Sequence, residues 1–177
     1  MSLAGRFVPR GASGRRYRLK PVALVLAPLV AIALQVKVPL FSEYLSFLES
    51  PLLVTVYFGL MTRAPIPALL IGAAVGLVQD ALSQNPLGLF GIVKTLIGYW
   101  TASVSLRMDA DNTVVRLIFA AVFYLIHQIL YWTLASSLLG QQFNFSVLEV
   151  LLLAAMNALV AVPLFQLMDR LREPARL

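Results

Sequence analysis

Residues 114–138 read VVRLIFAAVFYLIHQILYWTLASSL, and this run decides the class of the protein. It contains one charged side chain, Arg116, and it exceeds the roughly 20 apolar residues that a helix needs to cross a bilayer. The whole chain has the same character, because 60% of its 177 residues are hydrophobic and only 12% are charged. Soluble domains have about 45–50% apolar and about 25% charged residues. The sequence therefore predicts a polytopic helical membrane protein.

Six apolar segments, separated by turn residues, predict an all-α fold with six transmembrane helices. Their approximate ranges are 21–36, 51–61, 66–82, 87–106, 114–138 and 147–168, which form one membrane domain over residues 21–168. Residues 1–20 are expected to be a mobile basic tail, and residues 169–177 a short basic tail. The second segment is short for a span. It begins at Pro51 with Ser50 as N-cap, or it begins near Leu45, or it enters the membrane only halfway.

The basic residues predict the orientation of these spans. With the N-terminus in the cytoplasm, the outer loops carry only Lys37, and Lys94 lies within a span. The inner segments then carry Arg6, Arg10, Arg15, Arg16, Arg18, Lys20, Arg63, Arg107, Arg116, Arg170, Arg172 and Arg176. This asymmetry follows the positive-inside rule and favours an even number of spans, with both chain ends in the cytoplasm.

Composition also excludes several kinds of chemistry. The chain has no cysteine and one histidine, His127, so it cannot form a disulfide, an iron–sulfur cluster or a His-rich metal site. It contains no G-x-S-x-G, H-E-x-x-H or P-loop motif and no pair of close carboxylates. The net charge of +6 is explained by topology, so no nucleic-acid partner is expected. We expect no cofactor and no enzymatic activity.

Two ionisable residues lie inside predicted spans, where a charge is costly. Asp80 falls in the last turn of the third helix and Lys94 about two turns into the fourth. Because these helices form a hairpin, the favoured interpretation is an ion pair between Asp80 and Lys94 that fixes it. The alternatives are a proton or ligand site, or an Asp80 that faces water at the outer end without a partner.

Two helix faces are candidates for a partner or a pocket. Small residues four apart allow close helix packing in a membrane, and the first helix has such a stripe. Polar groups on the fifth and sixth helices must face other helices, a cavity or a partner, because lipid cannot satisfy them. The candidate residues are Ala23, Ala27 and Ala31 on the first helix, Tyr124, His127, Gln128 and Tyr131 on the fifth, and Asn157 on the sixth. Hydrogen-bonded packing is the favoured role of His127.

The hairpin of the third and fourth helices resembles a known family. Residues 76–83 (GLVQDALS), 86–88 (PLG) and 96–99 (LIGY) are similar to the rod shape-determining protein MreD family. The positions that match its pattern are Gly76, Asp80, Gly88, Gly98 and Tyr99. The resemblance covers about residues 21–170 in outline and is specific only over this hairpin. The basic N-terminal tail and Lys94 are not part of the pattern.

The resemblance implies a non-catalytic scaffold subunit in the bacterial inner membrane, supporting peptidoglycan synthesis and rod shape. It implies association with MreC, a single-span protein, and with a complex of MreB, the RodA glycosyltransferase and a class B penicillin-binding transpeptidase. It also implies a fold similar to the substrate-binding subunits of energy-coupling-factor transporters. Membrane lipids would surround the helices and contact the basic tail.

Two other functions remain open at this point. One is a vitamin-binding subunit of an energy-coupling-factor transporter, suggested by the alanine stripe of the first helix and the polar face of the fifth. The other is a membrane enzyme that acts on a lipid-linked substrate through Asp80 or His127.

Overall fold

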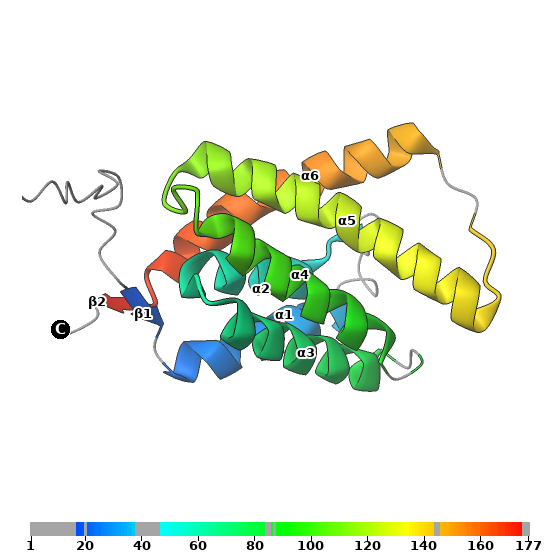
Figure 1. Cartoon of the computed structure of the whole chain (residues 1–177), viewed down its shortest axis with the longest axis horizontal. Helices are drawn as coiled ribbons and strands as arrows, with labels where there is room; N and C mark the ends of the chain where they lie inside the picture. The colour runs from blue at the N-terminus through cyan, green and yellow to red at the C-terminus, as the bar shows by residue number, and fades with distance from the viewer. Residues whose placement is uncertain are drawn as a thin grey trace, which may run out of the picture.

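The computed structural model describes residues 17–19, 21–37, 47–83, 86, 88–143 and 146–174 (Figure 1). Its described helices are α1 (Pro21–Lys37), α2 (Ser50–Thr62), α3 (Pro65–Leu82), α4 (Leu89–Ser105), α5 (Thr113–Leu139) and α6 (Val147–Asp169). These bounds lie close to the ranges expected from the apolar segments. The expectation for the basic tail falls largely on residues 1–16, which lie outside the described part of the chain.

Two short strands are an addition to the predicted all-α fold. Strand β1 (Tyr17–Leu19) pairs antiparallel with β2 (Arg172–Pro174), so that Arg18 lies opposite Glu173. No local pattern could indicate strands of three residues, because they form only where the two ends of the chain meet. We call the end of the bundle that carries this pair the strand end. Helices α1, α3 and α5 begin there, and α2, α4 and α6 return to it (Figure 1).

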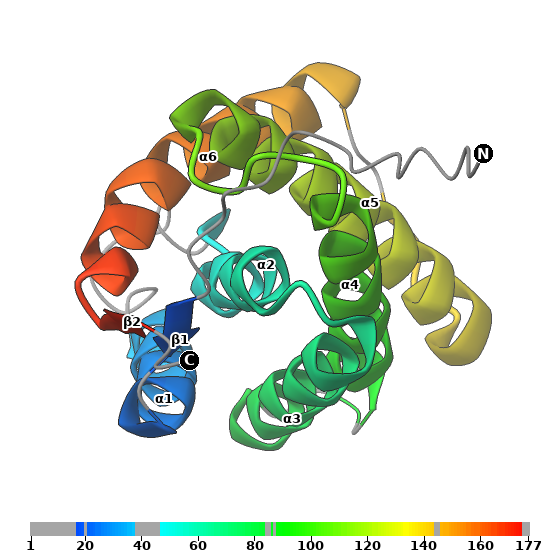
Figure 2. The same cartoon turned by 60° about the vertical axis from the view of Figure 1, so that its left-hand side comes forward.

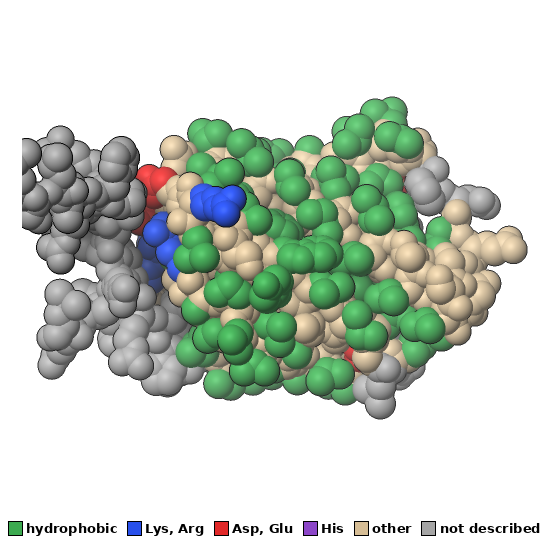
Figure 3. Space-filling model, in the orientation of Figure 1, with side chains coloured by type: hydrophobic (Ala, Val, Ile, Leu, Met, Phe, Trp, Pro, Cys, Tyr) green, Lys and Arg blue, Asp and Glu red, His purple; other side chains and the backbone are tan. Residues whose placement is uncertain are grey.

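The chain carries helices suited to a membrane. Among the described residues, α3, α5 and α6 are long and apolar enough to cross one, while α1 and α2 contain shorter apolar stretches. Large apolar side chains cover the outer surface: Ile66 is 71% exposed and Val147 70%. Figure 3 shows hydrophobic side chains spread over one face, with the basic and acidic ones gathered mainly towards the strand end. Such a surface is unfavourable in water and suits lipid.

Helix α2 occupies the centre of the bundle. Its residues from Ser50 to Leu60 are all buried, and Figure 2 shows the other described helices arranged around it. At 1.5 Å per residue its 13 residues extend about 20 Å, less than the roughly 30 Å of a bilayer core. Helix α2 is therefore shorter than a typical membrane span and is enclosed by the helices around it.

The predicted N-cap of α2 is wrong. Ser50 is the first helical residue and Glu49 takes the N-cap position, without a capping side-chain hydrogen bond. The backbone amide of Ser50 instead donates to the side chain of Gln35 on α1, at 3.2 Å. That of Glu49 donates to Asn157 Oδ1 on α6, at 2.9 Å. Because the helix begins inside the bundle, its free amides find partners on neighbouring helices.

Helices α3 and α4 form the closest contact in the fold. A Cβ atom at Gly72 would overlap the carbonyl oxygen of Lys94, and one at Gly76 would overlap that of Phe90. A Cβ at Gly98 would overlap the carbonyl of Ala68 on the opposite helix. The glycines thus let the two backbones touch over most of their length, which is how membrane helices pack when small residues repeat.

Candidate functional site

Asp80 is a buried cap that joins α3 to α4. Its Oδ1 accepts a hydrogen bond from the amide of Phe90 at 3.0 Å, and its Oδ2 accepts from those of Gly88 and Gly91 at 2.9 and 3.0 Å. Asp80 is only 1% exposed. A helix start has free N–H groups and a partial positive charge, and a carboxylate satisfies both. The residue therefore fixes the turn between the helices.

The five hairpin positions singled out from the sequence have different roles in this turn. Gly76 and Gly98 provide backbone contact, one on each helix. Gly88 has a positive φ of 103°, which a residue with a side chain adopts only with strain, and its amide reaches Asp80. Tyr99 lies on the outside of α4 and is 42% exposed. Four of the five thus build the hairpin, and Tyr99 faces its surroundings.

Lys94 pairs with a different acid from the one expected. Its Nζ lies 3.7 Å from Glu49 Oε2 and 4.4 Å from the centre of the Phe90 ring, and the residue is fully buried. The predicted pair with Asp80 is wrong: the Asp80 carboxylate binds the backbone amides at the start of α4, and Lys94 pairs with Glu49. Glu49 reaches Lys94 only because α2 begins inside the bundle, a feature that no local sequence pattern indicates.

The polar aromatic face of α5 points into the bundle. The rings of His127 and Tyr131 stack on Phe90 of α4, with centroid distances of 5.8 and 5.0 Å. Tyr124 is 2% exposed, and Gln128 is partly buried. These side chains therefore pack α5 against the first turns of α4, where Phe90 and Lys94 lie.

Asn157 holds the segment before α2 against α6. Its Oδ1 accepts from the amide of Glu49, and its Nδ2 donates to the carbonyl oxygens of Phe47 and Leu153, at 3.1 and 3.0 Å. The asparagine is completely buried. Its position fixes the height at which α2 starts, and therefore where Glu49 meets Lys94.

The alanine stripe of α1 is partly internal. Ala31 is 4% exposed and belongs to the core formed with α2, and Ala27 packs against that core. The side chain of Ala23 lies outside the described part of the chain. The stripe predicted as a partner face thus includes a residue that α2 already covers.

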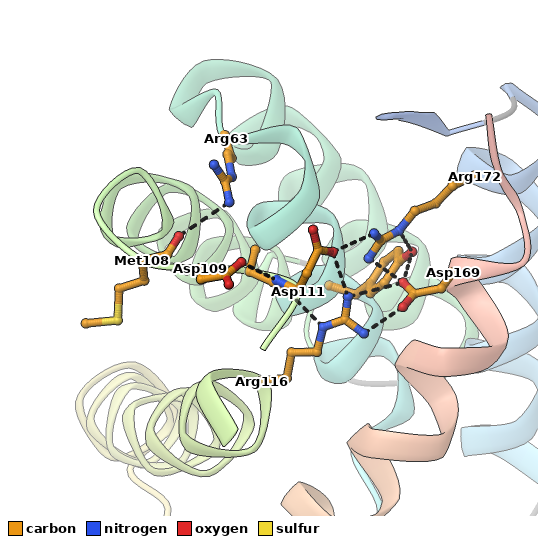
Figure 4. Close-up of polar contacts among 9 residues, drawn as sticks. Arg63, Met108, Asp109, Asp111, Arg116, Asp169 and Arg172 are labelled. Carbon is orange, nitrogen blue, oxygen red and sulfur yellow. Dashed lines mark hydrogen bonds and ion pairs between the residues drawn. The ribbon is translucent and has the colours of Figure 1, made fainter. Parts of the chain in front are cut away.

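A cluster of charges at the strand end was not singled out from the sequence. We call it the arginine clasp (Figure 4); its members are Tyr57, Asp111, Arg116, Asp169 and Arg172. Arg116 on α5 donates from Nη1 to Asp169 Oδ2 at 2.7 Å and from Nε to the carbonyl of Ala110 at 2.7 Å. The clasp thereby ties the last turn of α6 to the start of α5 and to the loop before it.

The second half of the clasp connects the strand pair to the bundle. Arg172 donates from Nη1 to Asp111 at 2.8 Å and from Nε to the Tyr57 hydroxyl at 2.9 Å, and it also pairs with Asp169. The Tyr57 hydroxyl in turn donates to Asp169 Oδ1 at 2.9 Å. Burial lowers the pKa of Arg172, but Asp111, Tyr57 and Asp169 outweigh it and leave this pKa raised. The guanidinium therefore remains charged and anchors β2.

The sequence contained a weak signal for the clasp. The positive-inside rule uses Arg116 and Arg172 only as topology markers, although Arg116 stands five residues after Asp111 and Arg172 three residues after Asp169. Acidic residues contribute little to the orientation of a membrane protein. Aspartates placed close to these arginines therefore indicate ion pairs that stabilise the structure. No group of three or more metal-binding side chains occurs among the described residues.

The comparison with family models agrees with the resemblance that the hairpin residues carry. A family model described as rod shape-determining protein MreD matches residues 16–172, nearly the whole chain. The match includes all five positions that carried the resemblance, together with the clasp and Asn157. No curated protein and no solved structure matches the chain.

Proposed function

Since the chain belongs to the rod shape-determining protein MreD family and therefore has a role in rod shape, we propose that it acts as a non-catalytic scaffold of the elongation complex. In this proposal it binds MreC directly and thereby supports peptidoglycan synthesis. MreB, RodA and a class B penicillin-binding transpeptidase belong to the same complex. The family match over residues 16–172 is the observation that carries this proposal.

The internal structure supports a scaffold. Its most conspicuous polar features, the Asp80 cap, the Asn157 bonds and the arginine clasp, all fix helices in place. The outer surface is apolar along the helices, as a protein needs when it offers lateral faces to the spans of other membrane proteins. A rigid bundle with such faces can hold partners at fixed positions.

We further propose that the protein crosses the bacterial inner membrane six times, with both chain ends in the cytoplasm. The β1–β2 pair supports this, because it brings residues from both ends of the chain to one end of the bundle. Arg63, Arg107 and Arg170 lie on turns at that same end. Together these features favour the strand end as the cytoplasmic one.

The test is replacement in the native bacterium. Depletion of the protein is expected to turn rods into round cells, and an affinity-tagged copy is expected to restore rods and to co-purify MreC. Mass spectrometry of the gently purified complex identifies proteins and small molecules together. Normal rods after full depletion would contradict the proposal. So would recovery of paired ATPases and a stoichiometric vitamin, which would identify a transporter subunit.

A further inference from the structure

A buried ion pair inside the bundle lacks the hydrogen bonds that such a pair requires. Lys94 Nζ and Glu49 Oε2 are 3.7 Å apart, too far for a hydrogen bond, and neither atom makes one with any described residue. Lys94 is fully buried. Its ammonium has three N–H donors, and its contact with the face of Phe90 satisfies none of them by hydrogen bonding.

The pair cannot be stable in this form by attraction alone. Removing two charges from water costs more than their attraction returns unless additional hydrogen bonds satisfy the remaining donors and acceptors. The backbone amides near Glu49 cannot help, because those of Glu49 and Ser50 are bonded to Asn157 and Gln35. A further group with both a donor and an acceptor is needed between the two side chains.

One side of the pair, that of Glu49, is open to its surroundings. The side chain of Glu49 retains 15% exposure, so a sphere of the size of water reaches it, while its Oε2 faces inward to Lys94. His127 lies nearby on α5, and neither of its ring nitrogens forms a hydrogen bond of ordinary geometry, although Gln128 is beside it. Lys94 and His127 therefore both lie against the ring of Phe90, and Glu49 lies beside Lys94.

We propose that Lys94 and Glu49, beside His127, form an internal binding site for a hydroxyl group, which accepts a hydrogen bond from Lys94 and donates one to Glu49. A hydroxyl has the required donor and acceptor on one atom and brings no charge into a pair that is already neutral. The hydroxyl belongs either to water or to the headgroup of a lipid. In both cases the site lies where α2 begins, and it stabilises a helix start inside the bundle.

Hydroxyl-radical footprinting of the full-length protein in lipid nanodiscs tests this site. Radiolysis of a bound water labels the side chains beside it even when they are buried. Phe90 is the reporter, because Lys94 lies over its ring, and the buried phenylalanines Phe58 and Phe123 are matched controls. If the hydroxyl is water, we expect several-fold more label from ¹⁸O-water on Phe90 than on either control.

A lipid hydroxyl gives a different result in the same design. Phe90 is then unlabelled in nanodiscs, native mass spectrometry retains one lipid per chain, and Phe90 becomes labelled after exchange into lipid-free detergent. The double variant Glu49→Leu with Lys94→Leu removes the site without leaving a lone charge, and it is expected to reduce Phe90 labelling to the control level. It is also expected to release a retained lipid.

Two results would overturn the proposal. One is a Phe90 that is labelled no more than Phe58 and Phe123 in both nanodiscs and detergent, with no retained lipid. The other is a folded double variant with unchanged Phe90 labelling, which would place the bound group elsewhere.

Discussion

Asp80 shows how one side chain can determine the geometry of two helices. A capping residue usually stands directly before its helix, whereas Asp80 belongs to the last turn of α3 and caps α4 across the turn. Its carboxylate is the acceptor for three amides, of which those of Phe90 and Gly91 are buried. Gly88 completes the arrangement, since its positive φ turns its amide towards Asp80.

Replacing this carboxylate should therefore destabilise the hairpin. We expect Asp80→Ala to lower the free energy of unfolding by roughly 2–4 kcal/mol, because three amides lose a charged acceptor in a buried site. Thermal unfolding in detergent measures the effect. Glu149→Gln, at an exposed carboxylate in the first turn of α6, is the control and should change stability by less than about 1 kcal/mol. Equal stability of the two variants would show that the Asp80 cap is dispensable.

At the scale of elements, α3 and α4 behave as one unit and α2 as a helix held by others. The α3–α4 pair owes its close contact to glycines whose missing side chains leave room for the opposite carbonyls. Helix α2, by contrast, is held by its burial in the core and by polar contacts with other segments, with Gln35 and Asn157 near its start and with the clasp at Tyr57. A short central helix therefore depends on the assembly of its neighbours.

A side chain on the inner face of α3 should separate the pair. We expect Gly76→Leu to destabilise the protein by at least about 3 kcal/mol, because the new side chain meets the backbone of Phe90 and Gly91, which cannot move aside. Ala74→Leu adds similar bulk on an exposed face of the same helix and should cost less than about 0.5 kcal/mol. Folded yield and unfolding temperature of the two variants give the comparison. A well-folded Gly76→Leu would argue against direct backbone contact.

For the whole molecule, the strand end is where distant parts of the chain are joined. The arginine clasp links α2, the loop before α5, α5 itself, α6 and β2 through charge-assisted hydrogen bonds. Arg116 and Arg172 are nearly buried, while Asp111 is 58% exposed, so the network lies at a boundary between interior and solvent. It fixes the ends of helices whose apolar surfaces alone would allow them to slide.

Arg116 and Asp169, which form an ion pair in the clasp, should be energetically coupled. We expect Arg116→Met and Asp169→Leu each to destabilise the protein by roughly 1–3 kcal/mol, and the double variant to lose less than their sum by about 1–3 kcal/mol. A double-mutant cycle from chemical unfolding measures the coupling. The control is Arg107→Met, at an exposed arginine in the loop before α5. It should change the free energy of unfolding by less than about 0.5 kcal/mol. Strict additivity would mean that Arg116 and Asp169 contribute independently.

The orientation of the whole molecule can be read from single cysteines, because the natural chain has none. Met108→Cys lies on an exposed turn at the strand end, and Gln141→Cys lies on an exposed turn at the opposite end. In intact spheroplasts a membrane-impermeant maleimide should label Gln141→Cys at once and Met108→Cys only after permeabilisation. The reverse pattern would invert the proposed topology.

The sequence determined the membrane class, the approximate helix ranges and the α3–α4 hairpin. Transfer of a segment into lipid depends on its own composition, and a hairpin joins neighbours in the chain, so local patterns contain this information. The resemblance carried by Gly76, Asp80, Gly88, Gly98 and Tyr99 was likewise local, and the family match confirms it. The spacing of its polar residues was enough to recognise the polar face of α5. It did not indicate that this face packs against the ring of Phe90.

Only the tertiary structure decided the partners of the charged side chains. Lys94 meets Glu49 rather than Asp80 because α2 begins inside the bundle, and Arg172 meets Asp111 because the chain after α6 lies beside the loop before α5. These pairs join residues far apart in sequence, and their formation depends on the packing of all the helices. A contact ion pair needs its nitrogen and oxygen within about 4 Å of each other, so the packed position of Glu49 decides the partner of Lys94. The periodicity of a single helix contains no information about that distance.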